Sequence, residues 1–571
     1  MYILKNILLI TFLLLIGLIT KGQEYYLEIR ESSASGYIDE LTSELEESYK
    51  DSATIHMKLR ESLSDMRRRG FLAASYDSIR VREDTLTAWL HVGRQYRWGQ
   101  FSLNVPDSSL FRGFTVFRGM NNNEVINLHE LNALEERIVT YLENRGYPFA
   151  SVRIERLEDA GSDTLNASLG IDPGKRYVID SIMIQGNNPV SEKYLYPYLG
   201  LYPGMVYNES RLKQIPDRIE NIAFLRQIRD FELEFSEGHR VNVFLYLERA
   251  ENNQVDGVVG FLPGGDGKIR FTGQFDLSLS NLFRRGEYLA VNWNSLEKQS
   301  QEFNLQMDFP YLLLQSVGIN ASFDLYKKDT SFLSRTFRAG LSFYISSQSR
   351  LEVFGDFEGS SLISEAPEVK ERYEPFNMRL YGARYAFNNL DYRLNPSRGL
   401  ELDLFGSLGR RRGGEDDESR TSAETGLDIS WYQPLFRSWV VKASGYGRFK
   451  YMWSEGTKGF MENELYRFGG FESLRGFDDH AFLAPVYSVV SLELRYLLSR
   501  NSNLYAFWDG GWYQRDMSSG IKEDLPFGFG IGAHIDTGGG IMYISYALGQ
   551  QAGSPIELGS AKIHLGYVSK F

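Results

Sequence analysis

Residues 254–571 alternate between apolar and polar side chains in short segments separated by turn residues. Such alternation is typical of β-strands, because successive side chains point to opposite faces of a sheet. The pattern predicts sixteen strands, and an even number suits a closed antiparallel membrane barrel, in which closure satisfies every backbone group. The segments lie at 254–262, 268–280, 286–295, 302–309, 317–326, 334–346, 349–358, 378–388, 399–409, 423–434, 438–450, 486–497, 503–513, 526–536, 540–548 and 562–571.

The connections between these segments alternate in length. Residues 435–437 form one of the short connections, whereas residues 451–485 form the longest. Bacterial outer-membrane barrels have short turns on the periplasmic side and longer loops outside. The alternation therefore places residues 451–485 outside the membrane, as the sixth outer loop, which we call loop 6.

The region before the barrel has a mixed pattern, in which strand-like segments are interrupted by amphipathic helical runs. An aromatic residue marks each helix-to-strand junction at nearly constant spacing, at Phe71, Tyr147 and Phe224. A fixed period of this kind indicates tandem modules. The sequence thus predicts three β-α-α-β-β modules, at 23–93, 94–175 and 176–250, followed by the barrel at 251–571.

Residues 1–22 have the features of a secretory signal peptide. Lys5 precedes an apolar run at 7–19, and Gly22 lies near the expected cleavage point. The run is shorter than the ~20 apolar residues that a membrane-spanning helix needs. We therefore expect residues 1–22 to direct export rather than to anchor the chain.

Composition and motifs exclude several classes of function. The 571 residues include no cysteine, which excludes disulfides, thiolate metal ligands and a Cys nucleophile, and the net charge of −12 argues against a nucleic-acid partner. No G-x-S-x-G, H-E-x-x-H or phosphate-loop pattern occurs. We predict no enzymatic activity, no metal and no cofactor. The alternatives are a passive porin and an outer-membrane hydrolase, for which Asp478-Asp479-His480 is the candidate cluster.

Within loop 6, residues 466–477 are rich in aromatic residues and glycine. Arg475 stands between Leu474 and Gly476, and Phe477 follows. Apolar rings beside a cation favour a loop that folds into the barrel. An ordinary glycine-rich surface loop fits the same composition.

Period two along the strands identifies the partners that such a loop would meet. In segment 486–497 Leu494 points outward and Glu493 inward, and in segment 503–513 Trp508 points outward and Asp509 inward. An arginine fork on a carboxylate is directional as well as attractive. We expect Arg475 to lie inside the barrel within hydrogen-bond reach of Asp509, with Glu493 nearby.

These motifs resemble those of the BamA/TamA family of outer-membrane assembly and translocation proteins, also called bacterial surface-antigen barrels. The loop residues 474–477 are similar to the family's sixth-loop motif, and 507–510 to the strand motif that receives it. Residues 178–187 look like part of a POTRA (polypeptide-transport-associated) domain, and three modules with sixteen strands look most like the TamA branch. Further family-like stretches lie at 281–287, 308–311, 395–399 and 563–571.

The resemblance implies a seam where the first and last barrel strands meet weakly, so that client strands pair with the exposed edge. The candidate seam residues are Gly257, Val258 and Gly260 in the first strand and Leu565, Gly566 and Phe571 in the last. Glycine weakens strand interiors, although it also marks ordinary bulges.

The resemblance also implies the surroundings of the protein. It places the barrel in the outer membrane of a Gram-negative bacterium and the POTRA modules in the periplasm. The expected partners are the lipid bilayer, unfolded outer-membrane or secreted client proteins, and a periplasm-spanning or accessory protein bound by the modules through exposed sheet edges. A two-partner-secretion-type polypeptide transporter is the nearest alternative.

Overall fold

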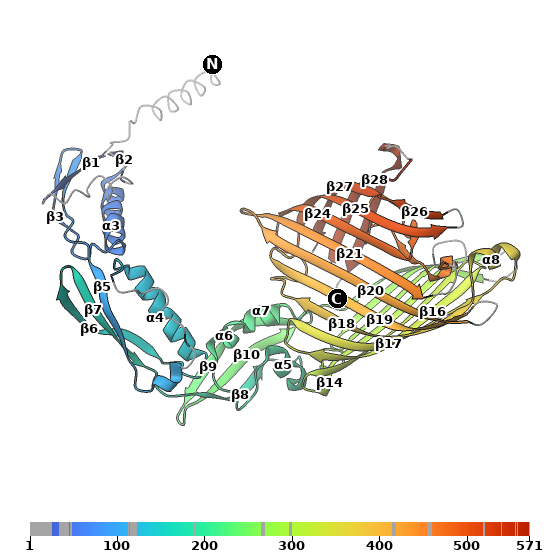
Figure 1. The fold of residues 1–571 in the computed structure, drawn as a ribbon, viewed down its shortest axis with the longest axis horizontal. Helices are drawn as coiled ribbons and strands as arrows, with labels where there is room; N and C mark the ends of the chain where they lie inside the picture. The colour runs from blue at the N-terminus through green and yellow to red at the C-terminus, as the bar shows by residue number, and fades with distance from the viewer. Residues whose placement is uncertain are drawn as a thin grey trace, which may run out of the picture. The chain divides into compact units, whose positions relative to one another are not determined.

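The computed structural model describes residues 25–32, 45, 48–111, 114, 123–187, 189–263, 269–295, 300–413, 418–453, 459–517, 520–537, 540–553, 556 and 558–569. The predicted signal peptide and Phe571 lie outside these residues. The chain divides into two compact units, Met1–Val178 with Val206–Ser210, and Ile179–Met205 with Arg211–Phe571. Figure 1 shows the elements of both, and each unit is described by itself.

The first unit contains two small sheets, each covered by a helix. In one, helix α3 (Ser52–Arg68) buries Ile55, Leu59 and Met66, whose spacing places them on one helical face. The sheet has the order β2-β1-β4-β3, and β1 runs parallel to β4. Its strands are β1 (Tyr25–Glu31), β2 (Ser48–Tyr49), β3 (Ser75–Arg82) and β4 (Thr85–His91).

The other sheet of this unit has the order β5-β7-β6, with β5 (Arg97–Asn104) parallel to β7 (Thr164–Asp172) and β6 (Ser151–Gly161) antiparallel to β7. A 3-10 turn, η1 (Ser108–Phe111), follows β5. Helix α4 (Leu128–Glu143) packs Leu134, Ile138 and Leu142 into the core of this sheet.

The second unit opens with a third small sheet, of order β8-β10-β9. It consists of β8 (Val178–Gln185), β9 (Leu225–Ser236) and β10 (Arg240–Arg249), with helices α5 (Glu192–Leu199), α6 (Glu209–Lys213) and α7 (Ile215–Glu220). Several helices therefore precede the strand pair here, whereas the described residues of the first two sheets include one α-helix each.

The remainder of the second unit is one large antiparallel sheet whose strands pair in chain order. It contains seventeen strands, but β26 and β27 both pair with β25, so the sheet has the sixteen positions that the sequence predicted. The strands are β11 (Gln254–Pro263), β12 (Ile269–Ser280), β13 (Tyr288–Ser295), β14 (Gln301–Leu314), β15 (Val317–Lys328), β16 (Phe332–Tyr344), β17 (Ser349–Leu362), β18 (Phe376–Asn388), β19 (Gly399–Gly413), β20 (Glu418–Pro434), β21 (Trp439–Trp453), β24 (Val486–Leu497), β25 (Asn503–Met517), β26 (Gly520–Asp524), β27 (Phe527–Asp536), β28 (Gly540–Gln550) and β29 (Lys562–Ser569); a short helix, α8 (Pro367–Arg372), precedes β18.

The two end strands of this sheet meet without a ladder. Cα atoms of β11 and β29 come within 8 Å of each other, yet no hydrogen-bonded pairing joins the two strands among the residues that the structure describes. Every other pair of neighbouring positions in the sheet is joined by a ladder. Figure 1 shows the curvature of this sheet.

Burial follows the predicted period of two. Along β24, Ser491, Glu493 and Arg495 are buried, whereas Leu492 and Leu494 are exposed on the outer face. Charged side chains thus face the interior of the barrel, and apolar side chains face outward, as in barrels that contact lipid. None of the described helices is both long and apolar enough to cross a membrane.

Candidate functional site

Loop 6 connects β21 to β24 and carries its own short hairpin. Its strands β22 (Tyr466–Phe468) and β23 (Phe482–Ala484) pair with each other, after a 3-10 turn, η3 (Glu462–Glu464). Leu474 is completely buried and belongs to a cluster with Phe468, Phe482 and the strand residues Tyr487 and Tyr513. The apolar residues of the loop therefore pack against the inner wall of the barrel.

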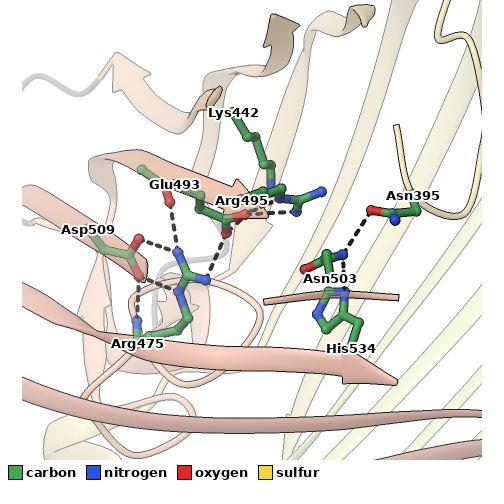
Figure 2. A network of polar contacts seen from close by, with 9 residues as sticks. Asn395, Lys442, Arg475, Glu493, Arg495, Asn503, Asp509 and His534 are labelled. Atoms are coloured by element: carbon green, nitrogen blue, oxygen red, sulfur yellow. Dashed lines mark hydrogen bonds and ion pairs between the residues drawn. The ribbon is translucent and has the colours of Figure 1, made fainter. Parts of the chain in front are cut away.

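Arg475 is the centre of a buried polar network (Figure 2). Its Nε and Nη2 donate to the two carboxylate oxygens of Asp509 at 2.7 and 2.6 Å, which is a fork geometry. Its Nη1 donates to Glu493 at 2.8 Å, and Nη2 also donates to Ser491 at 2.9 Å. The guanidinium lies 3.7 Å from the ring centre of Phe507. We call these five residues the Arg475 clamp.

The two carboxylates of the clamp differ in their other partners. Glu493 also pairs with Arg495 at 2.7 Å and lies 3.7 Å from Lys442. The hydrogen bonds to the Asp509 carboxylate within the described residues all come from Arg475, including one from its backbone N–H at 3.2 Å. Because Asp509 is 0% exposed, its compensation depends on Arg475.

Glycines in β27 and β28 allow the backbone of loop 6 to approach these two strands closely. A Cβ added to Gly528 of β27 would stand 1.8 Å from the carbonyl oxygen of Arg475, and one added to Gly549 of β28 would stand 2.5 Å from that of Gly476. Gly476 itself has a φ of +96°, which disfavours other residues. Our sequence reasoning missed Gly528 and Gly549, although glycines in strand interiors are a signal for close backbone approach.

A second network in Figure 2 lies at the first residue of β25, Asn503. Asn503 donates to Asn395 at 2.8 Å, and both side chains are buried. Asn395 belongs to the family-like stretch 395–399, which precedes β19. This contact joins the start of β25 to a turn that is far away in the sequence.

The predicted seam residues do not form a common cluster. A Cβ on Gly257 would meet the backbone of Gln274 in β12 at 2.8 Å, whereas one on Gly566 would meet nothing within 4 Å. Leu565 is exposed on the outer face, and the backbones of Val258 and Gly260 pair with β12. Phe571 lies outside the described residues.

The side chains of the candidate hydrolase cluster contact different partners. The Asp478 carboxylate pairs with Lys562 at 2.6 Å, and His480 Nδ1 lies 3.6 Å from Glu302. Among the described residues, no group of three or more His, Cys, Asp or Glu side chains is placed to hold a metal ion.

The fold and the clamp define a class of protein: a β-barrel of sixteen positions with an inward-folded sixth loop, preceded by small α+β modules. Residues 281–559 match the family described as the Omp85 superfamily domain. The chain is similar to this family over the barrel region, and the similarity supports an outer-membrane location with the POTRA-like modules in the periplasm.

Two relatives and one solved structure illustrate the similarity. Outer membrane protein assembly factor BamA of Neisseria meningitidis serogroup B is 22% identical in an alignment of 474 positions that covers 75% of this chain and 56% of that protein. BamA of Buchnera aphidicola is 20% identical over 240 residues, 42% of this chain and 38% of that protein. CdiB from Escherichia coli has the same fold, with a TM-score of 0.53 and 14% identity over 91% of this chain and 98% of that one. The chain spans about half or less of the length of these two BamA relatives.

Proposed function

We propose that this protein inserts client polypeptides into the outer membrane or translocates them across it, without enzymatic chemistry. The observation that carries this proposal is the junction of β11 and β29, which lacks a ladder in the described residues, while the remaining positions of the sheet are fully paired. An unpaired strand edge is a template for another chain. The name of the BamA relatives, outer membrane protein assembly factor, supports the same function.

Delivery is assigned to the three small sheets, as separate modules at 23–93, 94–175 and 176–250. In the third, β8 and β9 are edge strands, and Ile228 on β9 is exposed. An extended chain adds to such an edge through backbone hydrogen bonds, which tolerate many sequences. The modules thereby hold unfolded clients, or an accessory protein, on the periplasmic side.

Transfer is assigned to the seam. A cavity of about 1320 Å³ lies inside the barrel at this place, bounded by β11 to β14, by loop 6 and by β29. Its lining includes Asp256 and Asp276 on the first strands and His564 on the last. These polar groups suit a hydrated, extended backbone. A client segment in this cavity is next to the strand edge with which it would pair.

The clamp is assigned the task of holding loop 6 against β24, β25, β27 and β28. A loop fixed to this wall lines one side of the cavity and leaves the seam strands free to separate. We propose Leu474, Arg475, Gly476 and Phe477 as the loop part of this device, with Asp509 and Glu493 as its partners in the barrel wall.

A reversible lock on the seam tests the proposal. Because the chain lacks cysteine, Val258→Cys with Gly566→Cys allows a single disulfide across the seam, at strand positions that share the parity of the cavity-lining residues Asp256 and His564. The control pair is Val441→Cys with Leu494→Cys, which are register partners in the paired strands β21 and β24. Oxidation of the seam pair should stop client assembly and reduction should restore it, whereas the control pair should have no effect. Normal assembly by the oxidised seam variant would refute the proposal.

The kind of client is tested by depletion. A general assembly factor leaves many outer-membrane proteins missing, whereas a two-partner-secretion transporter leaves one secreted protein missing. Assignment to the TamA branch stays a prediction that the same inventory examines. A porin would conduct ions strongly in single-channel recordings, and a hydrolase that uses His480 would lose activity in His480→Ala.

A further inference from the structure

The base of loop 6 carries a second buried cluster of charges, separate from the Arg475 clamp. The Glu464 carboxylate accepts from Arg411 Nε at 2.8 Å and from the Met461 backbone N–H at 3.0 Å. Arg411, on β19, also donates to Glu374 at 2.7 Å. The Arg411 and Glu464 side chains are only 2% and 4% exposed. This pair is as well shielded from water as the clamp.

Lys450 on β21 holds the same turn from another side. Its Nζ donates to the backbone carbonyl of Glu464 at 3.0 Å and pairs with Glu424 on β20 at 2.9 Å. The hydroxyl of Tyr466 donates to Glu424 at 2.9 Å, and the ammonium lies 4.9 Å from the centre of the Tyr466 ring. Both cations of the cluster thus contact loop atoms together with carboxylates from outside the loop, although Arg411 Nη1 has no hydrogen-bond partner among the described residues.

The two residues before Glu464 are also bound to the wall. The side-chain amide of Asn463 donates to Ser360 on β17 at 2.9 Å and to the carbonyl of Glu374 at 2.8 Å. Glu462 pairs with Arg372 at 2.7 Å and with Arg515 on β25 at 2.9 Å. We call residues 462–464 with Arg411 and Lys450 the Glu464 anchor.

The anchor and the clamp use different parts of the barrel. The buried contacts of the anchor come from β17, β19, β20 and β21, whereas the clamp comes from β24 and β25. Along the chain from the end of β21 at Trp453 to Arg475, the anchor lies about midway. The closure probability of a flexible segment varies as about the −3/2 power of its length, so halving the length raises it roughly threefold.

We propose that Glu464 is a positioning residue, which fixes where loop 6 enters the barrel so that Arg475 meets Asp509. In this proposal the anchor determines only the position of loop 6 and makes no contact with a client. Its importance for clients rests on the function proposed above, in which the loop must stay inside the barrel.

The experiment measures the loop position directly in the full chain, embedded in lipid bilayers. Nitroxides at Glu472→Cys, an exposed loop residue, and Gln306→Cys, an exposed residue of β14, report their separation by pulsed electron resonance. Glu464→Gln should add a second, longer distance and raise the fraction of released loop at least threefold. The control Asp356→Asn breaks the Arg338–Asp356 fork between two wall strands, at 2.6 Å for both bonds, and should leave the distance unchanged.

Two further variants separate positioning from damage to the fold. In Arg411→Gln with Glu464→Gln both charges are gone, so release of the loop there shows that the pair itself held it. Release in the single variant but not in the double variant would trace the effect to the stranded Arg411 charge and overturn the inference. Should Glu464→Gln fail to fold, Asn463→Ala removes three hydrogen bonds of the anchor without altering a charge and should still release the loop.

Client assembly is measured on the same proteins. A loop that stays in place in Glu464→Gln and in Asn463→Ala would overturn the anchor. A loop that is released while clients still assemble normally would leave the anchor standing and refute the role of loop 6 in the proposed function.

Discussion

Two regions of the same sheet differ sharply in how they are held together. Strands β24 and β25 pair continuously from Val486 with Gln514 to Leu497 with Asn503, and the clamp adds a buried arginine fork between this wall and loop 6. Strands β11 and β29 come close without a ladder in the described residues. Under the proposed function, opening is confined to the seam, because elsewhere it would expose unpaired backbone groups, each costing several kcal/mol in lipid.

Arg475→Ala should have the largest effect on the difference between the clamped β24–β25 wall and the seam. It leaves Asp509 buried without its guanidinium partner, and an uncompensated buried charge costs about 3–5 kcal/mol. We expect the free energy of unfolding from bilayers to fall by this amount and client assembly to fall at least tenfold. Arg475→Lys should recover little, because an ammonium cannot form the fork. Full activity of Arg475→Ala would contradict the role of the clamp.

Glycine-to-alanine substitutions with a smaller expected effect test the same difference between the clamped wall and the seam, because they probe how closely the backbones approach each other. Gly528→Ala puts a methyl group where the carbonyl oxygen of Arg475 lies, so the loop must lift, at a cost of about 1–3 kcal/mol. Gly566→Ala, at the seam, meets open space and should change the unfolding free energy by less than about 0.5 kcal/mol. Denaturant titration of both variants measures the difference. Equal changes in the unfolding free energy would contradict the closer backbone approach at Gly528 than at Gly566.

The smallest expected effect is a dependence on pH at the outer base of loop 6. Burial raises the pKa of the Glu462 carboxyl, but hydrogen bonds and charges from Arg372 and Arg515 outweigh it and hold the pKa below its ordinary value of 4.5. A lowered pKa in the folded state means that the stabilisation is present above pH 4.5 and is lost as the pH falls through the lower value. Nitroxide distances should show release of the loop base in this range, and Glu462→Gln should remove that component. An identical pH response in both proteins would exclude Glu462 as its source.

The sequence predicted much of the barrel because the signal is local. Alternation alone placed Glu493 and Asp509 inside, and the parity of loop lengths identified loop 6. The predicted strand ends were less accurate at the outer side. Strand β25 ends at Met517 rather than at residue 513, because its last residues are mostly polar and show no alternation of apolar and polar side chains. The extra strand β26 escaped notice for the same reason.

The second support of loop 6 could not be predicted. Arg411 and Glu464 are far apart in the sequence, and Arg411 lies in a run of charged residues that is typical of a solvated loop. Only the curvature of the sheet brings β19 to the base of the loop, where the arginine becomes buried. The pair of Arg475 and Asp509, by contrast, could be predicted because each residue lies in a recognisable motif, at 474–477 and 507–510.

A double-mutant cycle on the clamp tests the central claim most directly. Unfolding free energies are measured in bilayers for the unaltered protein, Arg475→Ala, Asp509→Asn and the double variant. If the two side chains hold loop 6 as one unit, the double variant should cost little more than Arg475→Ala alone, so that the coupling equals the cost of Asp509→Asn, about 2–3 kcal/mol. Additive costs, with a coupling near zero, would show that Arg475 and Asp509 act independently and would contradict the clamp.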